Sequence, residues 1–331
     1  MAKNQYTYAV ARIRSMEVSL FSQADIEQLL ACRDEKQCLQ LLQEKGWGNA
    51  DTPSDAEAIL TCEREKTWAE VGGMIDDMSV FDVLSYPDLF HNLKAAIKMV
   101  ASGTEIPGIF ISGTRIPARE ILDSVKNKEF EKLPDYMAGA AREAYETLLH
   151  TQDGQLCDIM IDRAALEAVY QAGKNAEDDI IREYAESTVA VADIKIAVRS
   201  QKTAKSLEFM KNAMAECGSL DVDALCRAAL GGVDTIAEYL EGTAYKGGAQ
   251  ALRESASAFE CWCDNRIIET IRPQLYNPFT IGPVVAYVLA RENEIKTVRI
   301  ILTGKQNELP EESIRERVRE MYVSDSSIRR L

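Results

Sequence analysis

Lys305 follows Gly304 in the way that the lysine of a phosphate-binding loop follows its second glycine. Such a loop reads Gly-x-x-x-x-Gly-Lys-Ser/Thr, because its backbone N–H groups cradle the phosphates and its hydroxyl holds Mg²⁺. Here Arg299 stands in place of the first glycine and Gln306 in place of the hydroxyl residue. The sequence therefore excludes nucleotide binding by this motif. It contains no Gly-x-Gly-x-x-Gly and no Gly-x-Ser-x-Gly either.

Paired acids could bind a metal-complexed diphosphate, as in helical enzymes that use Asp-Asp-x-x-Asp. The two candidate pairs are Asp76-Asp77 and Asp178-Asp179, but Val80 and Arg182 occupy the last position of the motif. We therefore interpret these acids as caps of the helices that follow them. A metal-dependent helical enzyme remains the less favoured alternative.

The spacing of the cysteine and histidine residues does not match that of a known metal site. The chain has eight cysteines and two histidines, no Cys-x-x-Cys, and one close pair, Cys261 and Cys263. A structural zinc site needs two ligand pairs at fixed spacing. We expect reduced cysteines, no metal, no cofactor and no catalytic residue.

Composition excludes other classes of protein. The 331 residues carry a formal charge of −15, which argues against a nucleic-acid binder. The longest uncharged stretch, 273–290, contains three prolines and reads as a loop entering a helix and not as a membrane span. No secretory signal precedes the first helix, so we expect a cytoplasmic protein without a transmembrane segment.

Apolar residues recur at helical spacing along most of the chain, which predicts an all-α architecture. Residues 135–150 place Tyr136, Ala140, Ala144, Leu148 and Leu149 on one stripe, and residues 179–199 do the same with Ile180, Tyr184, Val191, Ile194 and Val198. A long helix is predicted over 284–302, and 106–111 is predicted as a loop. The segment from Tyr6 to Val18 is expected to pack on C-terminal helices through Tyr6, Val10, Ile13 and Val18.

A repeat is the most informative feature of the sequence. Three predicted helices carry an apolar residue, a lysine and then a second basic residue, with the lysines 101 residues apart: Lys94 with Lys98, Lys195 with Arg199, and Lys296 with Arg299. A segment resembling a helix start follows each motif, at 116–121, 220–225 and 309–314, and Ser22 begins a similar one. The pattern predicts three helical units, at 1–103, 104–205 and 206–331.

Two interpretations of these six basic residues stay open. They are either paired with acids on the neighbouring long helix of their own unit, or they line a shared binding surface. Three similar helical units can stack as a solenoid or close around a cavity, and both shapes suit protein binding.

The run from Tyr287 to Lys305 with 309–314, together with 90–94 and 8–14, resembles the C subunit of the archaeal and bacterial A/V-type rotary ATPases, which is related to the d subunit of the eukaryotic vacuolar enzyme. The central motif departs from the first, because Ala192-Asp193 stands where the first has His91-Asn92.

The resemblance implies a non-catalytic rotor subunit, an all-helical pseudo-threefold funnel on the cytoplasmic face of the membrane. Its implied partners are the central axle subunits and the membrane proteolipid ring, in ATP-linked proton or sodium transport. A helical adaptor or scaffold outside rotary ATPases is the main alternative.

Overall fold

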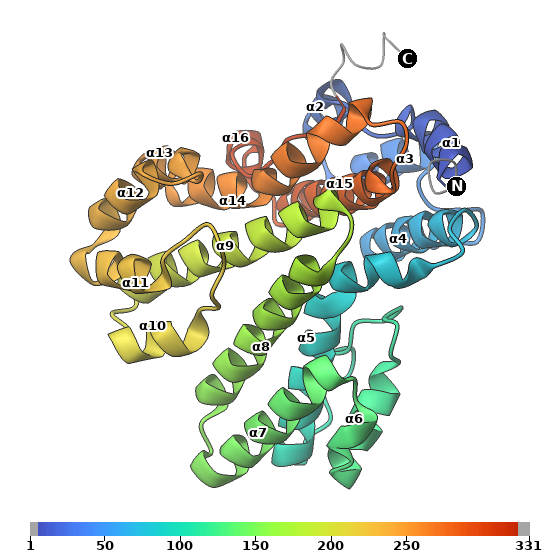
Figure 1. Ribbon diagram of the computed structural model, residues 1–331. Helices are drawn as coiled ribbons and strands as arrows, with labels where there is room; N and C mark the ends of the chain where they lie inside the picture. The colour runs from blue at the N-terminus through green and yellow to red at the C-terminus, as the bar shows by residue number, and fades with distance from the viewer. Residues whose placement is uncertain (1–5, 324–331) are drawn as a thin grey trace. The chain divides into compact units, whose positions relative to one another are not determined.

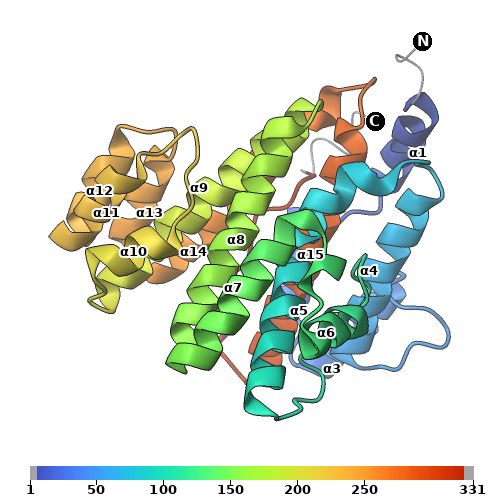
Figure 2. The same ribbon diagram turned by 60° about the horizontal axis from the view of Figure 1, so that its bottom comes forward.

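The computed structural model describes residues 6–323, which form sixteen α-helices and contain no β-strand (Figures 1 and 2). The predicted all-α architecture is therefore confirmed. The chain divides into two compact units. Unit 1 combines Met1–Met78 with Gln250–Leu331, and unit 2 is Ser79–Ala249. Because compactness and repetition are different properties, the division into three repeats stays a prediction.

Unit 1 is built from both ends of the chain, the blue helices and the orange to red helices of Figure 1. Its elements are α1 (Thr7–Glu17), α2 (Gln23–Leu30), α3 (Glu35–Glu44), α4 (Ala56–Gly72), α14 (Ala256–Ile271), η4 (Arg272–Tyr276), α15 (Gly282–Gln306) and α16 (Glu311–Arg315).

Helix α15 is the central element of unit 1. It packs against α1, α2, α3, α4, α14 and α16, and most of its residues are buried. Pro283 stands in its first turn, where a proline needs no hydrogen-bond partner. The main core cluster joins Val298, Ile301 and Leu302 of α15 to apolar residues of α2 and α3. Charges on the buried faces of such a helix need partners within the protein.

Close packing at the end of α15 requires a glycine. A Cβ atom on Gly304 would lie 2.6 Å from Cγ1 of Ile314 in α16. Ile314 itself is buried in the core cluster. The predicted long helix over 284–302 is thus confirmed and extends four residues further, to the point where α16 packs on it.

The predicted packing of the N-terminal helix on the C-terminal part of the chain is confirmed, since α1 contacts α15. Val10 and Ile13 are buried. Val18, however, is 56% exposed, so its assignment to the buried face was wrong. It lies one residue beyond the last residue of α1, where the helical spacing no longer holds.

Unit 2 is the continuous middle of the chain. Its elements are α5 (Asp82–Ser102), α6 (Ala118–Asn127), η3 (Phe130–Lys132), α7 (Asp135–Thr151), α8 (Gly154–Asn175), α9 (Asp179–Lys202), α10 (Leu207–Ala213), α11 (Val222–Gly231) and α12 (Val233–Glu241). Two elements cross the unit boundaries, η2 (Met78–Phe81) and α13 (Lys246–Glu254).

Long helices form the body of unit 2. Helix α8 packs against α5, α7 and α9, and Figure 2 shows α7 and α8 running alongside α5. The short helix α6 packs on α5, while α10, α11 and α12 pack on α9. Helices α8 and α9 approach closely at Gly173, whose Cβ atom would lie 2.2 Å from Cβ of Ala185.

The predicted face of α9 is confirmed at four of its five positions: Ile180, Tyr184, Ile194 and Val198 are buried. The predicted face of α7 was wrong at four of its five positions, since only Ala144 is buried. The buried residues of α7 are Met137, Ala141, Ala144 and Tyr145, whereas Tyr136 is 37% and Leu149 47% exposed. Alanines lie on several sides of this helix, so the packing of α5 and α8, and not the apolar pattern alone, selects its buried face. The predicted loop at 106–111 is confirmed.

Candidate functional site

The first pair of repeated basic residues lies on α5 and contacts α8. Lys94 Nζ is 2.7 Å from Asp162 Oδ1, and Lys98 Nζ is 2.7 Å from Asp158 Oδ1. Helix α8 lies beyond the predicted boundary at 103, so these acids belong to the next expected unit and not to the unit of the lysines. The side chains are partly exposed, and such pairs contribute about 0–1 kcal/mol each to stability.

The last pair lies on α15. Lys296 Nζ is 2.7 Å from Asp264 on α14, and Arg299 is 3.0 Å from Glu57 on α4. Arg319 also contacts Asp264, at 2.7 Å. Burial alone raises the pKa of Asp264, but the ion pairs with Lys296 and Arg319 lower it below its usual value.

The middle pair lies on α9. Lys195 is half-buried, and Arg199 is exposed in the last turn of the helix. The cations of the first and last pairs thus contact acids of neighbouring helices. A role of all six residues in a binding interface stays a prediction.

A second repeat, to which the sequence analysis assigned no role, lies two residues before each repeated lysine. Asn92, Asp193 and Glu294 are 101 residues apart and are 0%, 0% and 2% exposed. Each accepts a hydrogen bond from a backbone N–H of a segment that leads into a short helix. The donors are Ile111 before α6 (2.8 Å), Ala215 before α11 (3.1 Å) and Phe21 before α2 (2.6 Å). We call these three residues the anchors.

The signal for the anchors was present in the sequence. A polar residue stands at the same place in all three motifs, although its type changes from amide to short acid to long acid. The lysines are the more conspicuous signal, because their type is constant. The anchors differ from other polar residues in being buried. A helical pattern with a single polar residue does not predict whether that residue is buried.

Glu294 is the anchor with a cationic partner. It forms an ion pair with Arg291, one helical turn earlier on α15. Arg291 also contacts Glu63 of α4 at 2.5 Å, and its guanidinium lies 5.1 Å from the ring centre of Trp47. Burial raises the pKa of Glu294 to about 7, against the lowering effect of Arg291 and of the Phe21 N–H.

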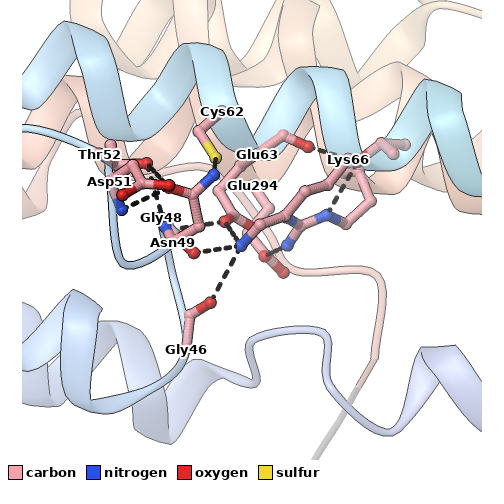
Figure 3. A network of polar contacts seen from close by, with 11 residues as sticks. Gly46, Gly48, Asn49, Asp51, Thr52, Cys62, Glu63, Lys66 and Glu294 are labelled. Carbon is pink, nitrogen blue, oxygen red and sulfur yellow. Dashed lines mark hydrogen bonds and ion pairs between the residues drawn. The ribbon is translucent and has the colours of Figure 1, made fainter.

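Glu63 connects this ion pair to the loop between α3 and α4 (Figure 3). It accepts a hydrogen bond from Gly48 N at 2.8 Å and contacts Lys66 at 2.6 Å. Lys66 in turn donates to the carbonyls of Gly46 and Gly48, at 3.2 and 2.5 Å. Gly46 and Gly48 have φ angles of 86° and 76°, in the left-handed region that glycine adopts without strain. The loop is therefore fixed by charge-assisted hydrogen bonds.

This cluster borders a pocket of about 250 Å³ in unit 1. The charged groups that line it are three cations and two acids: Lys45, Lys66, Arg291, Glu63 and Glu70. Each of these cations already contacts an acid, as Lys45 does with Asp25 at 2.6 Å. The arrangement stabilises unit 1, and each of these three cations is already paired with an acid of the protein.

Lys305 has a structural role in this fold. Its Nζ donates to the carbonyls of Leu30 and Cys32, at 2.7 and 2.5 Å, where α2 ends. Cations at a helix C-terminus satisfy carbonyls that have no partner within the helix.

No group of three or more His, Cys, Asp or Glu side chains that could hold a metal lies within residues 6–323. Over the same residues, no helix is both long and apolar enough to cross a membrane.

The comparison with protein families matches residues 9–317 to the ATP synthase (C/AC39) subunit. The C subunit of the A-type ATP synthase of Methanocaldococcus jannaschii is 23% identical, over 94% of this chain and 85% of the relative. The C subunit of the V-type sodium ATPase of Enterococcus hirae is 22% identical, over 94% of this chain and 97% of the relative. The C subunit of the V-type ATP synthase of Thermus thermophilus is 24% identical over 69% of this chain and 70% of the relative.

The match extends from α1 to the residues that follow α16, so it includes the three anchors and all six repeated basic residues. The chain belongs to the ATP synthase (C/AC39) subunit family.

Proposed function

We propose that this chain is a non-catalytic rotor subunit in the central stalk of a V/A-type ATPase or ATP synthase. It couples the axle subunits to the proteolipid ring of the membrane and so takes part in ATP-linked transport of protons or sodium ions. The observation that carries the proposal is the family match over residues 9–317, which is nearly the whole chain. It favours this function over an unrelated helical adaptor and over a metal-dependent helical enzyme.

The internal structure of each unit suits a part that transmits force. Helix α15 is surrounded by other helices of unit 1, and its buried charges are paired within that unit. In unit 2, α8 is packed between other long helices. Close-packed interiors have low compressibility and transmit strain.

The three-unit organisation is part of the same proposal. The anchors support it, because equal spacing, burial and one kind of backbone contact recur at Asn92, Asp193 and Glu294. Lys94, Lys98, Lys195, Arg199, Lys296 and Arg299 then mark equivalent positions of three repeats, which together form a pseudo-threefold funnel. The proposed location is the cytoplasmic face of the membrane, where the subunit is held peripherally by its partners.

The test removes this subunit from the purified complex and measures ATP hydrolysis and ATP-driven ion transport separately. Hydrolysis by the water-soluble head should continue, because the head carries the nucleotide sites. Ion transport should be lost, because the axle no longer drives the ring. Adding the purified chain back should restore transport.

Two results would contradict the proposal. One is ion transport that persists without the subunit, and the other is loss of hydrolysis in the head together with the subunit. Failure of axle and ring subunits to co-purify with the chain would favour the adaptor alternative.

A further inference from the structure

The three anchors each bind the backbone of a connecting segment, but they do so with three different side chains. Asn92 exchanges two hydrogen bonds with a single residue: Ile111 N donates to its Oδ1 at 2.8 Å, and its Nδ2 donates to Ile111 O at 3.0 Å. Glu294 accepts from Phe21 N with one oxygen and pairs with Arg291 through the other. In both side chains, each of the two polar atoms has a hydrogen-bond or ion-pair partner.

Asp193 uses only one of its oxygens as an acceptor. Ala215 N donates to Oδ1 at 3.1 Å, whereas Oδ2 is buried and has no hydrogen-bond partner among the described residues. The residue is 0% exposed, so bulk solvent does not solvate its carboxylate. An ionised carboxylate in this position would leave one charged oxygen without a donor, and burying such a group is strongly unfavourable.

The charged groups around Asp193 do not provide a partner for it. Arg163 on α8 attracts the carboxylate, but its Nε donates to Glu167 at 2.7 Å and its Nη1 to the carbonyl of Lys211 at 3.3 Å. Lys211 on α10 is paired with Asp223 on α11 at 2.7 Å.

Helix α11 carries Arg227, which is exposed and acts on the thiol of Cys226, whereas Arg163 is the cation that acts on Asp193 itself. Helix α11 places the thiol of Cys226 near Asp193, and the buried residues of α12 are Ile236, Ala237 and Leu240. The site therefore suits a neutral group.

We propose that Asp193 is held protonated in the folded protein and that its Oδ2–H donates to the carbonyl of Ala215, in the way that Nδ2 of Asn92 donates to the carbonyl of Ile111. The anchor then works as a proton-dependent latch on the segment that joins α10 to α11.

Burial raises the pKa of Asp193 to about 7, against the lowering effect of the Ala215 N–H and of Arg163. The ordinary pKa of an aspartate is about 3.9, so the folded state holds one proton more than the unfolded state between about pH 4 and pH 7. The stabilising effect of that proton is full below about pH 4. It declines as pH rises toward 7, and it is lost above 7.

Asp193→Asn tests the latch, because an amide supplies the same donor at every pH. We expect the unfolding constant of the wild type, divided by that of the variant, to rise about tenfold per pH unit between pH 5 and pH 7 and to level off above it. The measurement is chemical denaturation followed by circular dichroism. Other titrating groups are common to both proteins and cancel in the ratio.

Asn92→Asp is the matched variant, because it places an acid in the equivalent buried position of the first motif. Its unfolding constant relative to the wild type should rise with pH in the same way. A ratio of wild type to Asp193→Asn that does not change with pH would overturn the proposal.

A second measurement keeps the test valid if a variant fails to fold. The folded wild-type protein should show the infrared carbonyl stretch of a protonated carboxyl at pH 6, which isotope-labelled aspartate assigns to Asp. The band should disappear above pH 8. Its absence at pH 6, or its loss near pH 4, would show that Asp193 is ionised and that the latch does not exist.

Discussion

Arg291 is buried between two carboxylates, Glu63 and Glu294, and lies over Trp47. Arg291→Met removes the cation that is paired with Glu294, while Glu63 still forms its ion pair with Lys66. We expect a loss of about 3–5 kcal/mol in the free energy of unfolding at pH 8, because a buried carboxylate stays uncompensated. Denaturant titration measures this loss.

Arg299→Met is the control for this prediction, because the same change on the same helix breaks a pair that is about half exposed. Its effect should stay below about 1 kcal/mol. Adding Glu294→Gln to Arg291→Met should recover part of the loss. Equal effects of the two arginine substitutions would mean that the buried cluster contributes no more than a surface pair.

Contacts between elements depend on single glycines at the closest approaches. Gly173→Ala would place a methyl group 2.2 Å from Cβ of Ala185. This distance is too short for two carbon atoms, so α8 and α9 must move apart. We expect a loss of about 1–3 kcal/mol in the free energy of unfolding. In Gly139→Ala, on α7, the new Cβ atom has no neighbour within 4 Å. This substitution should raise the free energy of unfolding by up to about 1 kcal/mol, because alanine favours the helix over glycine. Thermal denaturation compares the two, and stabilisation by both would refute the close packing.

At the level of elements, the sequence predicted much of the fold. Helical spacing and the breaks at glycine and proline located α9 and α15, because those signals are local. The buried face of α7 and the exposure of Val18 could not be predicted from spacing, since they depend on which helices lie nearby. The anchors needed the same information, as their backbone partners are 19 to 273 residues away.

In the molecule as a whole, the two units differ in continuity. Unit 2 is one uninterrupted segment, whereas the core of unit 1 joins Leu29 and Leu42 to Ile295 and Ile301. We therefore expect a fragment of residues 79–249 to fold alone, with a cooperative thermal transition by circular dichroism. A fragment of residues 1–78 should stay unfolded until it is mixed with residues 250–331. Independent folding of 1–78 would contradict this assignment of the core.

The discontinuity of unit 1 also sets an order of events during synthesis. Helices α1 to α4 leave the ribosome first, but the helix that completes their core, α15, is among the last to be made. At about 5–20 residues per second, the intervening 79–249 segment takes roughly 10–35 seconds to translate. Throughout that interval the apolar faces of α2 and α3 lack the part of their core that α15 supplies. We therefore expect the nascent chain to be a substrate for chaperones until its final helices emerge, while unit 2 can already be folded.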